Sequence, residues 1–178
     1  MQLLKKQKLF FILIFITSSL LGYEPKCKLK NEFLYAIAEN EKHRSKDVGY
    51  PYLISFNNKK DAKRVKKYLL MLEGKWLDWR TYDCKNKELC SDISEILINH
   101  GVSNLDLGHM QISYYWHPMK LSYYFDFNKS NEKACLIIKD LVSKYGMSWK
   151  TIGKYHNFND KRNKKYREKI KRNLNIHT

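Results

Sequence analysis

The chain has 178 residues, which is enough for one domain with a substantial core but not comfortably for two. Hydrophobic residues make up 43% of it and aromatic residues 14%, and this composition excludes an intrinsically disordered chain. Its formal net charge of +16 predicts attraction to polyanions, whether nucleic acid, anionic lipid or an acidic cell wall.

Residues 1–22 have the pattern of a secretory signal peptide or an N-terminal anchor. A basic start is followed by an apolar run at 9–21, which is short for a membrane span, and the small Gly22 offers a cleavage point. We therefore expect an exported protein that works in the periplasm, associated with the cell wall, with its folded domain at 23–178. Export argues against a nucleic-acid partner, and a membrane would be contacted only through an uncleaved N-terminal segment.

Four cysteines allow three disulfide pairings in an oxidising compartment. Cys84 and Cys90 flank a short polar segment, so we expect them to pair, and a pairing of Cys27 with Cys135 would then remain. Metal binding is the alternative, but the spacing of Cys84 and Cys90 and the lack of a neighbouring histidine argue against it. We expect neither a metal nor another cofactor.

The first helix of the mature chain, expected at 28–43, carries the best candidate for a catalytic acid. Glu41 falls on the same helical face as Leu34 and Ile37. Glu39, two positions earlier, points away from that face. Burial against apolar side chains favours the neutral form of a carboxyl group, which is the form that a general acid needs. A buried glutamate paired with a cation is the structural alternative.

The other expected elements are mostly helical. The segment 50–57 is expected to be extended, and the stretch 104–113 to form a close turn around Gly108, with Gln111 able to donate and accept hydrogen bonds. Ser91 is a candidate cap for one later helix, and Ser130 or Asn131 for another. Further helices are expected at 60–73, 91–100, 130–145 and 149–156, a short strand at 76–82, and a basic C-terminal helix within 158–178.

Four ring side chains follow the central stretch, at 114–117. Tyr114 and its neighbours could stack on sugar rings, as aromatic side chains do in sugar-binding clefts, or could pack in the core. The sequence leaves both interpretations open.

Three short segments, far apart in the chain, together point to one family. They are 36–41 (Ala-Ile-Ala-Glu-Asn-Glu), 108–112 (Gly-His-Met-Gln-Ile) and 155–157 (Tyr-His-Asn). In this order they resemble the blocks of lytic transglycosylases that have a lysozyme-like soluble-transglycosylase domain, above all the conjugation- and secretion-associated type. The chain departs from the family pattern at Lys42, where a serine is usual, at His109 and at Ser113.

The resemblance implies an α+β, mostly α, lysozyme-like domain with a helical, cysteine-containing insertion at 57–103. It implies cleavage of the β-1,4 bond between N-acetylmuramic acid and N-acetylglucosamine in peptidoglycan glycan strands, leaving 1,6-anhydromuramyl ends. Glu41 would act as acid and then as base, in the service of a secretion, conjugation or pilus assembly machine. The residues expected to bind substrate are Ser55, Asn57, Met110, Gln111, Tyr114 and Tyr155.

Three alternatives remain open at the level of sequence. A muramidase would hydrolyse the same bond, with Asp106 as nucleophile or base. A non-catalytic module would bind peptidoglycan and use Glu41 only as a hydrogen-bonding anchor. An exported basic protein that binds nucleic acid or lipid would show affinity that falls steeply with salt.

Overall fold

A short buried strand, β1 (Leu53–Phe56), forms the centre of an antiparallel sheet whose order is β2-β3-β1-β4-β5. The structure is a computed structural model that describes residues 29–176. All four residues of β1 are buried, so the strand has no polar alternation, as expected for a strand covered on both faces. The other strands are β2 (Lys75–Trp76), β3 (Thr81–Asp83), β4 (Leu105–Leu107) and β5 (Ile112–Ser113).

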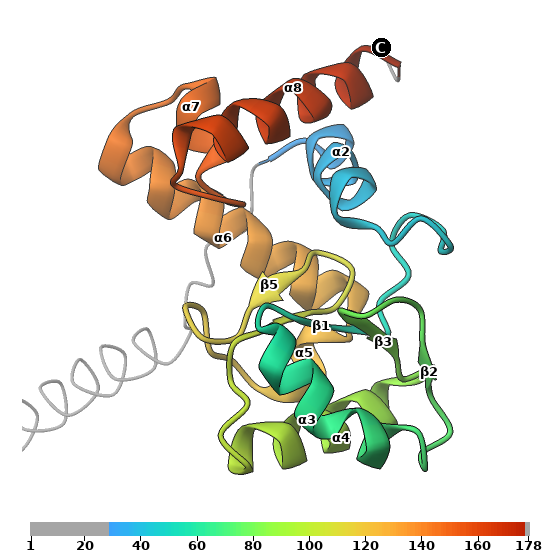
Figure 1. Ribbon diagram of the computed structural model, residues 1–178. Coiled ribbons are helices and arrows are strands. Elements are labelled where there is room, and N and C mark those ends of the chain that lie inside the picture. The colour runs from blue at the N-terminus through green and yellow to red at the C-terminus, as the bar shows by residue number, and fades with distance from the viewer. Residues whose placement is uncertain (1–28, 177–178) are drawn as a thin grey trace, which may run out of the picture.

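The helices fall into two groups with the long helix α6 between them (Figure 1). In the upper group α2 and α7 pack against α8, and in the lower group α3 and α4 contact β1 while α5 packs against α4. The α+β class expected from the sequence is confirmed. The helices are α2 (Asn31–Glu41), α3 (Lys59–Leu69), α4 (Lys87–Asn99), α5 (Leu121–Tyr124), α6 (Phe127–Tyr145), α7 (Trp149–Gly153) and α8 (Asp160–Ile176).

Two helices begin earlier than the sequence analysis predicts. Helix α4 starts at Lys87 rather than Ser91, because the Asn86 side chain accepts a hydrogen bond from a backbone amide of the first turn. Helix α6 starts at Phe127 rather than near 130, because the Asp126 side chain caps it in the same way. Both predicted caps were wrong, since an acceptor lay upstream of each one.

The predicted disulfide between Cys84 and Cys90 is confirmed. It ties the end of β3 to the first turn of α4, so the polar segment between the two cysteines is largely helical rather than a loop. The predicted pairing of Cys27 with Cys135 involves a residue outside the described range, as does the expected signal segment at 1–22. Within residues 29–176, no helix has the length and apolar character to cross a membrane.

The turn between β4 and β5 is held close to the chain that precedes α6. Gly108 has φ +74°, and a Cβ atom there would lie 1.9 Å from the backbone oxygen of Tyr124. Gln111 also has a positive φ, +46°, and its side-chain amide donates to the Gly108 carbonyl oxygen at 2.8 Å. Only glycine meets both demands at position 108, the left-handed backbone and the close approach.

We predict that Gly108→Ala lowers the free energy of unfolding by about 3 kcal/mol, because it combines left-handed strain with a backbone collision. Gly101→Ala is the matched control. Its φ is +77°, but nothing lies within 4 Å of the added atom, so it should cost only about 1 kcal/mol. Denaturant unfolding of both variants measures the difference, and equal losses would contradict the close packing at Gly108.

Candidate active site

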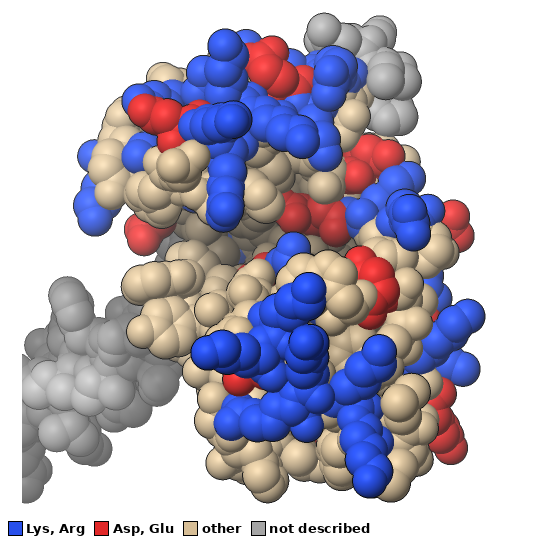
Figure 2. Space-filling model, in the orientation of Figure 1, with Lys and Arg blue, Asp and Glu red and all other residues tan. Residues whose placement is uncertain are grey.

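A cleft of about 960 Å³ lies where α2, the β4–β5 hairpin, the end of α6 and the segment 154–158 meet. Figure 2 shows basic surface over α7 and α8 and again over α3, with a hollow between them in which acidic atoms are visible. The lining includes six polar or ionisable residues that could bind or react with a ligand: Glu41, Asn57, Asp106, Gln111, Tyr155 and His156.

Glu41 is the last residue of α2 and points into the protein rather than into bulk solvent. Its side chain is only 11% exposed, and Oε1 is buried with no hydrogen-bond partner among residues 29–176. The helix ends here because Lys42 adopts an extended backbone, and the Lys42 side chain turns outward to pair with Glu39. Glu41 is thus separated from the two charged side chains beside it in sequence.

Two rings enclose the Glu41 carboxylate. Nδ1 of His156 lies 3.6 Å from Oε1, an ion-pair distance that is too long for a hydrogen bond. The His156 ring stacks on Tyr166 of α8, with centroids 4.6 Å apart and planes 4° from parallel. Burial raises the pKa of Tyr166 well above its usual value, and the charge of Glu41 raises it further. Tyr166 is therefore a neutral phenol beside the acid.

The second carboxylate of the cleft, Asp106 on β4, is already paired. Nη2 of Arg80 contacts its Oδ2 at 2.5 Å and also donates to Asn57 at 2.8 Å. Burial raises the pKa of Asp106, while hydrogen bonding from Asn57 and the charge of Arg80 oppose that rise. Asp106 is held in a polar network, whereas Oε1 of Glu41 has no such partner.

Tyr155 connects the two sides of the cleft. Its hydroxyl donates to the carbonyl oxygen of Met110 at 2.8 Å, so its proton is directed to the β4–β5 turn and not to Glu41. Burial raises the pKa of Tyr155 well above 10, and the nearby carboxylates of Glu41 and Asp106 add to this. The un-ionised hydroxyl of Tyr155 therefore joins, by a hydrogen bond, two segments that are far apart in the sequence.

The remaining expected binding residues are placed differently from one another. Asn57 and Gln111 line the cleft. Ser55 is buried on β1 and its hydroxyl lies 3.4 Å from that of Thr81, while the Met110 side chain is fully buried. Tyr114 packs against Tyr124 in the core and does not line the cleft. Of the other three rings in this row, Trp116 and His117 line the cleft and Tyr115 does not.

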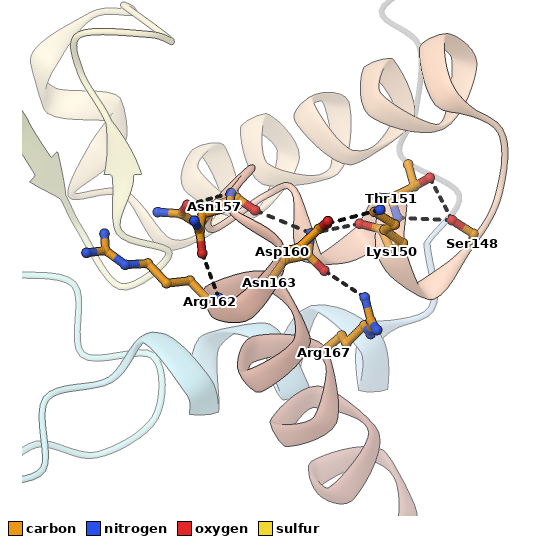
Figure 3. Close-up of polar contacts among 9 residues, drawn as sticks. Ser148, Lys150, Thr151, Asn157, Asp160, Arg162, Asn163 and Arg167 are labelled. Carbon is orange, nitrogen blue, oxygen red and sulfur yellow. Dashed lines mark hydrogen bonds and ion pairs between the residues drawn. The ribbon is translucent and has the colours of Figure 1, made fainter.

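The segment that carries Tyr155 and His156 is fixed from below by Asn163, a buried residue of α8 (Figure 3). Its side-chain amide donates to the carbonyl oxygens of Lys150, at 2.9 Å, and Asn157, at 3.3 Å, and its oxygen accepts from Arg167. Gly153 makes room for it, because a Cβ there would lie 2.2 Å from the Asn163 oxygen. The contact with Asn157 holds the cleft segment to α8, and the other two join Asn163 to α7 and to Arg167 in the next turn of α8.

Several lining residues were given no role from the sequence. Arg80 lies in the expected insertion, and only the fold shows that it reaches Asp106, 26 positions away. His156 belongs to the third family-like segment, but nothing in the sequence indicates its contact with Glu41. In the part of the chain that the structure describes, no group of histidine, cysteine and carboxylate side chains could hold a metal ion.

Comparison with known proteins identifies no relative of this chain. No family model matches the chain, and no curated protein and no solved structure matches it either. The function must therefore be argued from the site.

We predict that His156 titrates above the usual histidine range. The adjacent Glu41 carboxylate is the main cause of the raised pKa, with Asp106 adding to it and both burial and the charge of Arg80 opposing it. In Glu41→Gln the stabilising anion is lost, so the titration midpoint should fall. NMR titration of the imidazole resonances measures this, with Glu39→Gln as the control that leaves the midpoint unchanged. A midpoint insensitive to Glu41→Gln would contradict the pairing.

Proposed function

We propose that this protein is a peptidoglycan lytic transglycosylase in which Glu41 acts first as acid and then as base. The observation that carries the proposal is the placement of Glu41, a nearly buried carboxylate with an unpartnered oxygen, on the wall of the cleft. The cleft volume of about 960 Å³ lies in the range of sites that enclose a ligand. The disulfide supports an oxidising compartment, as export to the periplasm would provide.

The first step requires the neutral form of Glu41, which donates a proton to the oxygen between N-acetylmuramic acid and N-acetylglucosamine, whereas the ionised form is the one that pairs with His156. The bond from that oxygen to the muramyl anomeric carbon breaks, and the freed sugar leaves as an alcohol. The substrate's own 2-acetamido group stabilises the positive charge at the anomeric carbon, as in substrate-assisted glycosidases. No second protein carboxylate is required for this step.

In the second step Glu41, now ionised, takes the proton of the muramyl 6-hydroxyl group. The 6-oxygen forms a bond to the anomeric carbon and gives a 1,6-anhydro ring, so no water is consumed and Glu41 regains its proton. Protonated His156, 3.6 Å away, would stabilise the ionised carboxylate between the two steps. The neutral hydroxyl groups of Tyr155 and Tyr166 would carry no charge that opposes it.

A muramidase is the second candidate, because Asp106 lines the same cleft and its charge helps to raise the pKa of Tyr155, which also lines it. In that case Asp106 would be the nucleophile or the base that activates water. The pairing of Asp106 with Arg80 and the contact of Arg80 with Asn57 favour a positioning role instead. The products separate the two reactions, since hydrolysis leaves reducing ends and transglycosylation leaves anhydro ends.

We predict that Glu41→Gln lowers release of soluble muropeptides from purified sacculi by about a thousandfold, because the amide cannot donate and then accept the proton. Glu39→Gln is the matched control, since Glu39 pairs with Lys42 at the surface of the same helix. Mass analysis of the products should show anhydromuramyl ends, each lighter by one water than a reducing end.

Two outcomes would contradict the proposal. Reducing ends as the main product would assign the protein to the muramidases. Glycan binding without any release by the wild-type protein would make it a non-catalytic wall-binding module. Thermal unfolding of Glu41→Gln shows whether a loss of activity reflects chemistry or a loss of fold.

A further inference from the structure

Three cationic side chains from three separate segments line the cleft. Lys144 lies at the end of α6, Lys154 in the segment after α7, and Arg162 in the first turn of α8. We call these three residues the basic cluster. Within residues 29–176, none of them has a carboxylate within ion-pair distance, whereas the neighbouring Lys150 is paired with Asp160. The cluster therefore presents unneutralised positive charge to the cleft.

Two exposed rings accompany the basic cluster. Nζ of Lys154 lies 4.6 Å from the centroid of Tyr145 and 4.5 Å from that of Phe158, so the lysine is held between them. The rings are 43% and 59% exposed and meet edge to face. Cation–π contacts of this kind fix a lysine without neutralising it. The arrangement combines a fixed cation with apolar surface on which an aliphatic chain can lie.

The cleft lining contains one further carboxylate besides Glu41 and Asp106, that of Asp140, against the three cations of the basic cluster. Figure 3 shows the Arg162 side chain extending from the start of α8 away from the Asn163 network, which leaves its guanidinium group available. Backbone contacts hold the start of α8 in place, since Arg162 donates its amide proton to the Asn159 side chain. The basic cluster is therefore suited to a flexible ligand with several carboxylates.

We propose that the basic cluster binds the carboxylates of the peptide stems attached to the glycan. The inference rests on the proposed function and adds a substrate requirement to it: the protein engages stem-bearing strands in preference to strands from which the peptides have been removed. A stripped strand keeps one lactyl carboxylate on each muramic acid. A stem carries several carboxylates on a flexible peptide with aliphatic side chains, which matches three cations and two exposed rings.

The test uses the full chain carrying Glu41→Gln, so that bound glycan is not cleaved. Calorimetry compares three probes: soluble peptidoglycan fragments with intact stems, the same fragments after amidase treatment, and neutral chitin oligosaccharides. Stem-bearing fragments should bind about tenfold more tightly than stripped ones, since each exposed charge pair adds a small increment. The preference should shrink as salt rises.

Lys144→Gln together with Arg162→Gln should abolish the preference, so that stem-bearing and stripped fragments bind with the same affinity. Lys139→Gln together with Lys161→Gln is the matched control, because it removes the same charge from the same two helices at positions that do not line this cleft. The control should keep the preference. Thermal unfolding verifies that both double variants are folded.

The outcomes are distinguishable. Equal affinity for intact and stripped fragments overturns this inference and leaves the proposed function standing. No binding of any of the three probes overturns the proposed function itself. A preference that survives in the Lys144 and Arg162 variant, or that is lost equally in the control, overturns the assignment to the basic cluster.

Discussion

The packing of α2 against α8 is the contact on which the candidate site depends, because it decides where the side chain of Glu41 ends. The residues Leu34, Ala36, Ile37 and Ala38 of α2 are buried. Two asparagines then join the backbones: the Asn173 side chain donates to the Ala36 carbonyl oxygen at 3.3 Å, and the Asn40 side chain to that of Tyr166 at 3.5 Å. A buried carboxylate costs free energy unless a charge or a donor offsets it. Burial of Glu41 therefore costs free energy, which the packing of α2 against α8 must offset.

The cleft is also an assembly of distant segments, and one hydrogen bond joins them. Tyr155 reaches the Met110 carbonyl oxygen, 45 positions away, and so ties the chain after α7 to the β4–β5 turn. That turn exists because Gly108 accepts a left-handed backbone against the chain before α6. The Asn163 network fixes the other end of the Tyr155 segment. Local contacts therefore hold both segments that the Tyr155 hydrogen bond joins.

Local patterns predicted part of this arrangement and missed the rest for physical reasons. The 3.6-residue period placed Glu41 on the buried face of its helix, and the short spacing of Cys84 and Cys90 predicted their disulfide, because both are properties of neighbouring residues. Ser55 was expected to face sugar, but every side chain of β1 is buried, so alternation gave no guide to its direction. The contacts of Arg80 with Asp106 and of His156 with Glu41 depend on segments brought together by the fold, and no local pattern encodes them.

The charge distribution around the cleft depends on which charged side chains have a partner of opposite charge and which do not. Arg80 neutralises Asp106, which leaves Glu41 as the carboxylate with an unpartnered oxygen, with His156 as its nearest cation. Elsewhere in the cleft lining, Lys144, Lys154 and Arg162 have no carboxylate partner within residues 29–176. A strand lying in the cleft would therefore meet both an acid with an unpartnered oxygen and unneutralised cations. If the cluster binds the stem of one muramic acid as proposed, that contact would set the register of the strand, and register determines which glycosidic bond lies beside Glu41.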